Sequence, residues 1–164
     1  DNIHDPMVVK AIATLVDRLT AKEGPVSPKR LTEVVADAFH FARLPQNRAD
    51  EILALKLPRL DTDKEGFTHP QAQNMQANRI WRRSDEPATR SMADISLFEI
   101  GNAMRDIADV SEGIRKEELF KVTATVFGFK KLSENIESRL ELALNDAVQS
   151  RRVIDEQNGF VKAL

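Results

Sequence analysis

Side chains that can perform acid–base or metal chemistry occur in this sequence, but not at spacings that define a catalytic site. Carboxylate pairs stand at Glu117–Glu118 and at Asp61 and Asp63, and such pairs can share a proton or bind a cation. Charged helix faces and turns explain them equally well. There is no cysteine, which excludes thiol catalysis and cysteine-based zinc sites. The three histidines are far apart in sequence: His4, His40 and His69. We therefore expect no catalytic residue, no metal site and no cofactor.

Basic side chains are the other candidates, because Lys and Arg bind phosphate groups. The net charge of -2 and the pI of about 6.0 argue against a protein that binds polyanions over its whole surface. A local basic patch stays open. The candidates for nucleic-acid contact lie at helix junctions and in the central segment: Arg43, Arg79, Arg82, Arg83, Arg90, Lys130, Lys131, Arg151 and Arg152. The alternative is that these are ordinary solvated charges, since binding requires them to converge in space.

An internal repeat organises the chain. A shift of 88 residues places Leu31–Asn47 on Leu119–Asn135, and seven of the 17 positions are identical. Six of the seven matches are apolar: Leu31, Val34, Ala36, Phe39, Phe41 and Leu44 align with Leu119, Val122, Ala124, Phe127, Phe129 and Leu132, and the seventh pairs Asn47 with Asn135. A repeated apolar frame indicates a duplicated structural unit.

Each copy reads as three helices followed by a hairpin. Upstream, the same shift aligns two apolar helical faces, around Ile12 and around Ile100. In the first copy, Ser27 is the expected N-cap of the second helix, with Pro28 at its first position. We expect that helix to bury Leu31, Val34, Val35, Ala38 and Phe39, and its counterpart to bury Leu119, Val122, Thr123, Val126 and Phe127. It ends just after Phe39 or Phe127, so that His40 and Gly128 take the left-handed conformation.

The third helix is expected to differ in length between the copies. It opens at Pro45 in the first copy and after the N-cap Ser133 in the second, where Ile136, Leu140, Ala143, Leu144 and Ala147 point inward. Pro58 stops the first one early. Each copy then ends in a small hairpin, within residues 61–67 and 153–161, because Glu-Gly or Asn-Gly lies between extended stretches.

These elements predict a mainly α fold with small β-hairpins, built from tandem duplicated winged-helix-like three-helix units. The first repeat spans residues 5–69 and the second spans residues 95–164. Residues 70–94 form a linker with a short extended segment that partly packs, with Trp81 as its anchor.

The third helix of the second copy carries acidic residues on its outward side. Glu134, Glu137, Glu141 and Asn145 occupy the positions that a DNA-binding helix uses to approach the major groove. Carboxylates repel phosphates, so readout of a DNA groove by this helix is not expected.

Short motifs carry a resemblance to a known family: Glu23-Gly-Pro-Val26, Phe39-His-Phe-Ala-Arg43, Ile80-Trp81 with Arg90, Glu99-Ile100 with Ala103, and Val126-Phe-Gly-Phe-Lys130. In these residues the chain resembles an uncharacterised domain at the C-terminus of very large bacterial proteins related to superfamily-one helicases, often beside a restriction-endonuclease-like domain. It departs from the family pattern at His40, where glycine is usual. The resemblance implies an accessory module of defence-related or DNA-processing machinery, with the ATPase and nuclease chemistry in other domains.

We therefore predict a non-catalytic accessory module of a larger helicase- or nuclease-type protein that assists nucleic-acid binding. The alternative is a protein-interaction or structural module that docks on the helicase or nuclease domains of the parent protein. The chain starts at Asp1 without a leader and has no apolar run near the roughly 20 residues that span a bilayer. We expect a piece of a longer cytoplasmic protein, with DNA or parent domains as partners and no membrane. The oligomeric state stays open.

Overall fold

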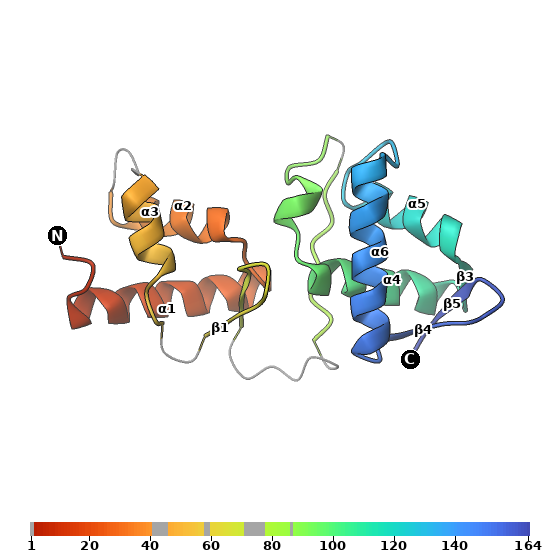
Figure 1. The fold of residues 1–164 in the computed structure, drawn as a ribbon, viewed down its shortest axis with the longest axis horizontal. Coiled ribbons are helices and arrows are strands. Elements are labelled where there is room, and N and C mark those ends of the chain that lie inside the picture. Colours follow the sequence, from red (N-terminus) through yellow and green to blue (C-terminus); the bar gives the residue numbers. More distant parts are fainter. Residues whose placement is uncertain (1, 41–45, 58–59, 71–77, 86) are drawn as a thin grey trace. The chain divides into compact units, whose positions relative to one another are not determined.

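The computed structural model describes residues 2–40, 46–57, 60–70, 78–85 and 87–164. The chain forms two compact units, Asp1–Ala72 and Gln73–Leu164. Both are mainly helical, and each has a small antiparallel sheet (Figure 1). None of the helices in the described residues is long and apolar enough to cross a lipid bilayer.

The first unit contains three helices and a hairpin: α1 (Pro6–Glu23), α2 (Pro28–Ala38), α3 (Gln46–Leu53), β1 (Asp61–Thr62) and β2 (Thr68–His69). Helix α2 begins where the sequence predicts it, because the Ser27 hydroxyl accepts a hydrogen bond from the backbone amide of Arg30 (3.1 Å). Val26 and Thr68 exchange backbone hydrogen bonds of 3.0 and 2.9 Å and so form an isolated β-bridge beside β2. The core of this unit consists of Ile3, Ile12, Val16, Val26, Leu31, Val35 and Ile52.

The second unit has corresponding helices and a hairpin, with a short 3-10 helix before them and a strand, β3, where the first unit has only the bridge at Val26. Its elements are η1 (Met92–Asp94), α4 (Leu97–Val110), β3 (Ile114–Arg115), α5 (Lys116–Val126), α6 (Glu134–Gln149), β4 (Val153–Asp155) and β5 (Phe160–Ala163). Its sheet has the order β3-β5-β4 with antiparallel pairs. The Ser133 hydroxyl caps α6 by accepting from the amide of Ile136 (3.3 Å), which confirms the predicted N-cap.

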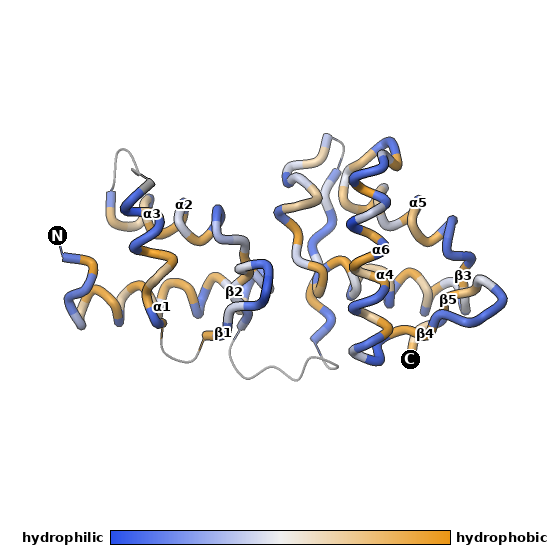
Figure 2. Tube along the Cα trace, viewed as in Figure 1, coloured by the Kyte–Doolittle hydropathy of each residue, from blue (hydrophilic) through white to orange (hydrophobic). Residues whose placement is uncertain are grey.

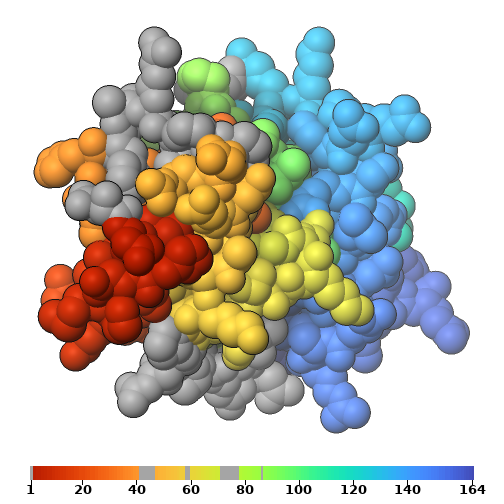
Figure 3. Space-filling view, turned by 60° about the vertical axis from the view of Figure 1, so that its left-hand side comes forward, coloured from red at the N-terminus to blue at the C-terminus, as the bar shows by residue number. Residues whose placement is uncertain are grey.

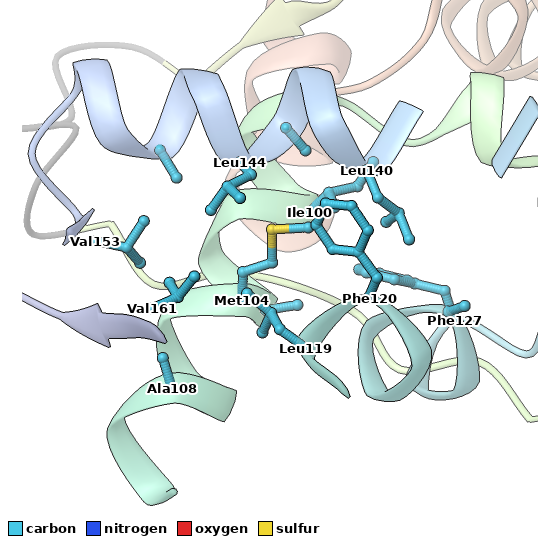
Figure 4. Close-up of a cluster of buried hydrophobic side chains, with 14 of the residues drawn as sticks. Ile100, Met104, Ala108, Leu119, Phe120, Phe127, Leu140, Leu144, Val153 and Val161 are labelled. Atoms are coloured by element: carbon cyan, nitrogen blue, oxygen red, sulfur yellow. The ribbon is translucent and has the colours of Figure 1, made fainter. Parts of the chain in front are cut away.

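Helix α4 lies at the centre of the second unit. Its residues from Phe98 to Arg105 are all buried, because α5, α6 and the sheet cover one side and the central segment covers another. Figure 4 shows Ile100 and Met104 of α4 among side chains from α5, α6 and the sheet. Hydrophobic and hydrophilic stretches alternate along α1 and α6 in Figure 2, as expected for helices that bury one side.

The duplication predicted from the sequence is visible in the backbone. Helices α2 and α5 begin and end at positions 88 apart, and α3 and α6 begin 88 apart. The residues that follow α2 and α5 take the predicted left-handed conformation, with φ of 57° at His40 and 90° at Gly128. Glycine adopts this region without strain, whereas a residue with a Cβ does so at a cost of about 1–2 kcal/mol.

The buried sides of α2 and α5 are rotated from the prediction. Ala38 is exposed and Val34 is half-buried, whereas Thr32 and Ala36 are buried. In α5 the equivalent positions, Phe120 and Ala124, join the core. The prediction was wrong here because apolar residues surround more than half of each helix, so residue type alone does not select the buried side.

The central segment packs as part of the second unit. The predicted linker, residues 70–94, includes residues 71–77 and 86, which lie outside the described residues. The remainder, from Asn78 to Asp94, lies within the second unit, and Trp81 packs against its core. The predicted partial packing through Trp81 is therefore confirmed.

Candidate interaction surface

Two of the predicted phosphate-binding arginines contact a buried carboxylate. Glu99, at the start of α4, is fully buried. Arg90 donates two hydrogen bonds to it, of 2.9 Å to Oε1 and 2.8 Å to Oε2, in the fork geometry that suits a carboxylate. The backbone amide of Arg82 also donates to Oε2 (3.0 Å), and Nη2 of Arg82 lies 4.0 Å from Oε1. The charge of Arg90 is therefore compensated inside the protein.

Polar side chains of α4 bind the backbone of the central segment. Asn102 donates to the carbonyl of Ile80 (3.0 Å), and Arg105 donates to the carbonyl of Asn78 (3.1 Å). Burial lowers the pKa of Arg105, and the positive charge of Arg79 lowers it further. These contacts give hydrogen-bond donors to backbone carbonyls of the extended central segment.

Trp81 and Arg79 share one acidic partner. The Trp81 indole donates to Oδ2 of Asp106 (2.7 Å), and Arg79 donates to Oδ1 of the same carboxylate (3.3 Å). The indole ring also meets Phe127 edge-on at a centroid distance of 5.9 Å. Arg79 is half-exposed, so its charge is only partly screened by this pairing.

Arg152 is enclosed in the core of the second unit. Its side chain is 0% exposed, and Nη1 donates to the carbonyl of Phe98 (2.8 Å) and to Oδ1 of Asn102 (2.9 Å). Nη2 pairs with Asp146 at 2.9 Å. Burial lowers the pKa of Arg152 to about 10, although Asp146 acts in the opposite direction. A guanidinium held in this way does not reach a phosphate, so Arg152 leaves the set of candidate binding residues.

The guanidinium of Arg152 also explains a glycine in the middle of α4. A Cβ added at Gly101 would lie 2.7 Å from Nη2 and 2.9 Å from Nη1 of Arg152, closer than atoms pack. Glycine has a low helix propensity, but a larger residue at position 101 would collide with this guanidinium.

Three of the remaining basic candidates are brought together. The amide of Ser84 donates to the carbonyl of Val126 (2.9 Å), so the segment that carries Arg83 lies along the turn between α5 and α6. That turn carries Lys130 and Lys131, and all three cations are exposed. We call Arg83, Lys130 and Lys131 the basic cluster.

The last two candidates lie away from the basic cluster. Arg151 is exposed at the opposite end of α6, a helix of 16 residues, which separates it from Lys131 by about 24 Å. Arg43 lies outside the described residues.

The outward face of α6 is acidic. Its exposed residues are Glu134, Asn135, Glu137, Ser138, Leu142, Asn145, Val148 and Gln149. The one cation of this helix, all of which the structure describes, is Arg139, and it donates to the carbonyls of Met92 (3.2 Å) and Ile95 (2.7 Å). Leu142 is 53% exposed. The face thus combines carboxylates with an exposed leucine and presents no basic side chain.

Basic residues on the neighbouring elements do not make the α6 face positively charged. Lys116 pairs with Glu141 at 2.9 Å, which raises the pKa of Lys116. In the hairpin, Asp155 is exposed and Lys162 pairs with Glu156 at 3.3 Å. The charges of Lys116 and Lys162 are therefore compensated by carboxylates.

Helix α3 of the first unit resembles α6 in this respect. Asp50 is exposed, and Arg48 pairs with Glu51 at 3.1 Å. The third helices of both units therefore present carboxylates toward solvent.

Two polar interactions were not predicted from the sequence. One is the buried pair of Arg90 and Glu99, which the spacing of the two residues does not reveal. The other is in the first unit, where Nε2 of His69 lies 2.8 Å from Oδ2 of Asp63, the carboxylate that also accepts from two amides of the hairpin turn. Asp63 was a candidate for acid–base chemistry, and its contacts here are those of a turn residue.

Within the described residues, no group of three or more His, Cys, Asp and Glu side chains is arranged to hold a metal ion. Comparison of the chain with protein-family models, curated proteins and solved structures gives no match. The arrangement of side chains is therefore the basis for a functional proposal. It favours non-covalent binding through the α6 face or through the basic cluster.

Proposed function

We propose that the two units are tandem winged-helix-like domains, which together form a non-catalytic docking module of a larger cytoplasmic protein. In this proposal the second unit presents α6 to a basic surface of another protein domain. The order of three helices and a hairpin in both units supports the winged-helix assignment, as does the extended pairing after the first helix, a bridge in the first unit and strand β3 in the second. The resemblance of the chain to a domain of helicase-like proteins suggests that the docking surface belongs to a helicase or nuclease domain of the parent.

One observation carries the choice of a protein partner: α6 exposes Glu134 and Glu137, while its single arginine donates to backbone carbonyls of its own unit. In DNA-binding proteins with this plan, the third helix meets phosphates and base edges. Each carboxylate held about 6 Å from a phosphate would contribute a repulsion of about 0.7 kcal/mol in water. Because the same charges attract Lys and Arg of a protein surface, docking is favoured over groove binding.

Leu142 supplies the apolar contact that such an interface needs. It is 53% exposed and lies among Ser138, Asn145 and Gln149 on the outward side of α6. Protein interfaces bury a small apolar centre within a polar rim. On this face the leucine forms the centre, and the glutamates form one side of the rim.

The experiment is photo-crosslinking from α6 in the intact parent protein. A photo-reactive residue replaces Leu142, and the matched control carries it at Val110, an 85% exposed apolar residue at the end of α4. We expect Leu142 to crosslink to another domain of the same polypeptide and Val110 not to do so. Crosslinks from Leu142 to bound DNA, or an equal yield from both positions, would contradict the proposal.

The basic cluster supports a second candidate function, assistance in nucleic-acid binding. If Arg83, Lys130 and Lys131 each contact a phosphate, affinity should fall about 40-fold between about 50 and 200 mM salt. Asp85 and Glu134 lie within three residues of these cations in sequence, and their negative charges oppose the attraction of the cluster for phosphate.

Fluorescence polarisation with single-stranded and duplex DNA at both salt concentrations measures this function. Replacement of the three cations by alanine should abolish salt-sensitive binding, whereas Arg151→Ala, the control at the far end of α6, should leave it unchanged. No binding at about 50 mM salt would exclude this candidate and leave protein docking.

A further inference from the structure

The two copies differ by five residues between the third helix and the hairpin. Helices α3 and α6 begin at Gln46 and Glu134, an offset of 88. The backbone pairing of Val26 with Thr68 corresponds to that of Ile114 with Val161, and Thr68 and Val161 are offset by 93. The first copy is therefore five residues shorter here, and α3, with 8 residues against 16 in α6, is shorter by about 2.2 helical turns.

In the second unit, that length of helix fills the core. Position 141 is the equivalent of Leu53, where α3 ends, and α6 continues from there to Gln149. Three side chains of this continuation are almost completely buried, namely Ala143, Leu144 and Ala147. In the first copy a proline at position 58 disfavours helix at the residue before it, so no such continuation forms.

The first unit has a groove beside the end of α3, and its lining includes Leu31 and Ile52, whose counterparts 88 positions on, Leu119 and Leu140, lie in the core around α6. The groove is a cavity of about 440 Å³, within the range of ligand-binding pockets. Its apolar lining comes from α2, from the end of α3 and from the segment that follows α3: Leu31, Ile52, Leu53, Leu55, Leu57 and Leu60. Helix α3 and the hairpin, orange to yellow, lie at the surface of the first unit in Figure 3. We call this feature the α3 groove.

The groove has an apolar floor and a basic rim. Leu31 and Ile52 are buried at its base, and Leu53 is 43% exposed at its edge. Lys56 is exposed and is the one charged residue among the lining residues that the structure describes. An occupant that matches this lining has apolar side chains on one face and carboxylates beside them.

We propose that the α3 groove binds a short amphipathic helix of a partner protein, whose apolar residues at i and i+3 take the places that Leu144 and Ala147 occupy in the second unit. Carboxylates on the flank of that helix face Lys56. A helix is the expected occupant because in the second unit α6 buries Leu144 and Ala147 in a core that includes Leu119, the counterpart of Leu31. Recognition of this kind, a helix laid in an apolar groove, uses apolar anchors at helical spacing. The groove lies in the first unit and does not involve the α6 face.

The probe is a fluorescent peptide with the sequence of Glu134–Gln149, which has four carboxylates and one arginine. It contains Ala143, Leu144 and Ala147, which α6 buries in the core of the second unit. We expect saturable binding to the whole chain in a polarisation titration. A peptide with L144E and A147E is the control, and it should bind at least about tenfold more weakly, since two apolar anchors are lost.

The protein variant is Leu53→Asp. Because Leu53 is partly exposed at the groove edge, the change should leave the fold intact, as circular dichroism would verify, and weaken peptide binding at least about tenfold. Val110→Asp, an exposed apolar position in the other unit, should bind as the unchanged chain does.

Three results would overturn the proposal. The first is the absence of saturable binding, and the second is equal affinity of the chain and its Leu53→Asp variant. The third is a concentration-dependent dimer in sedimentation velocity that Leu53→Asp abolishes, because the occupant would then be a second copy of this chain.

Discussion

Two adjacent arginines provide a sharp test of the structure. Arg151 and Arg152 are neighbours in sequence and were equivalent as phosphate-binding candidates, yet Arg151 is exposed and Arg152 is fully buried. Arg152→Ala would remove the partner of Asp146 and leave the buried oxygens of Phe98 and Asn102 without their donor. Asp146 is 41% exposed and can be solvated, so the cost comes mainly from the two oxygens, at about 1–3 kcal/mol for each buried acceptor left without a partner. Arg151→Ala should change the free energy of unfolding by no more than about 0.5 kcal/mol.

Urea unfolding followed by Trp81 fluorescence measures this difference. Trp81 is the only tryptophan of the chain and packs in the second unit, so its signal reports that unit. If Arg152→Ala does not fold, Arg152→Met keeps most of the side-chain volume and should be destabilised less than Arg152→Ala, though more than Arg151→Ala. Equal losses at positions 151 and 152, or no loss at 152, would refute the account of the buried guanidinium.

Three further predictions follow from local geometry. Gly101→Ala, which normally stabilises a helix, should lower the melting temperature of the second unit by at least about 5 °C because its Cβ meets Arg152; an unchanged or higher temperature would contradict this. His40→Gly should raise the free energy of unfolding of the first unit by about 1 kcal/mol, measured by hydrogen exchange in α2, because φ is 57° there; a loss of stability would count against it. Burial raises the pKa of Asp63, but hydrogen bonds from His69 and two backbone amides lower it more, so the pKa is below its ordinary value. The folded carboxyl then contributes stability above about pH 4 that is lost as the pH falls through the folded pKa. Calorimetry should show a smaller acid-induced loss for Asp63→Asn, and an identical loss would exclude this role.

Much of the fold was predictable because repeated local signals agree. Ser27 and Ser133 cap helices where the sequence predicts it, and the left-handed residues His40 and Gly128 end the second helices. Helix caps and left-handed helix ends depend on residues that are close together in the chain, so they can be predicted from the sequence alone. The inward residues of α6 from Leu140 to Ala147 were likewise given by helical spacing.

The contacts of the basic residues could not be predicted from the sequence, because their partners are distant in the chain. Arg152 reaches the carbonyl of Phe98, which is 54 residues away, and Arg79 reaches Asp106, 27 residues away. Residue type shows only that a cation is present. Whether it meets a carboxylate, a carbonyl or solvent depends on the tertiary arrangement. For this reason the nine candidates reduce to a basic cluster of three, while Arg151 is exposed elsewhere and Arg43 lies outside the described residues.

The outward residues of α6 were easier to predict from the sequence than the contacts of the basic residues. Glu134, Glu137 and Glu141 were expected to point outward, and Glu134 and Glu137 are exposed while Glu141 pairs with Lys116. The exposure of Leu142 was not expected, since leucine within an apolar helical stretch usually packs inside. An exposed leucine beside carboxylates is the feature that directs the functional proposal toward a protein partner.

The central claim is that α6 serves a protein surface and not a DNA groove, and amide NMR titration with duplex DNA at about 50 mM salt tests it most directly. We predict that the resonances of Ser138, Leu142 and Asn145 do not move, and that any shifts are confined to the basic cluster. Saturable shifts along α6 that disappear at about 200 mM salt would contradict the account and identify this helix as a nucleic-acid-binding element.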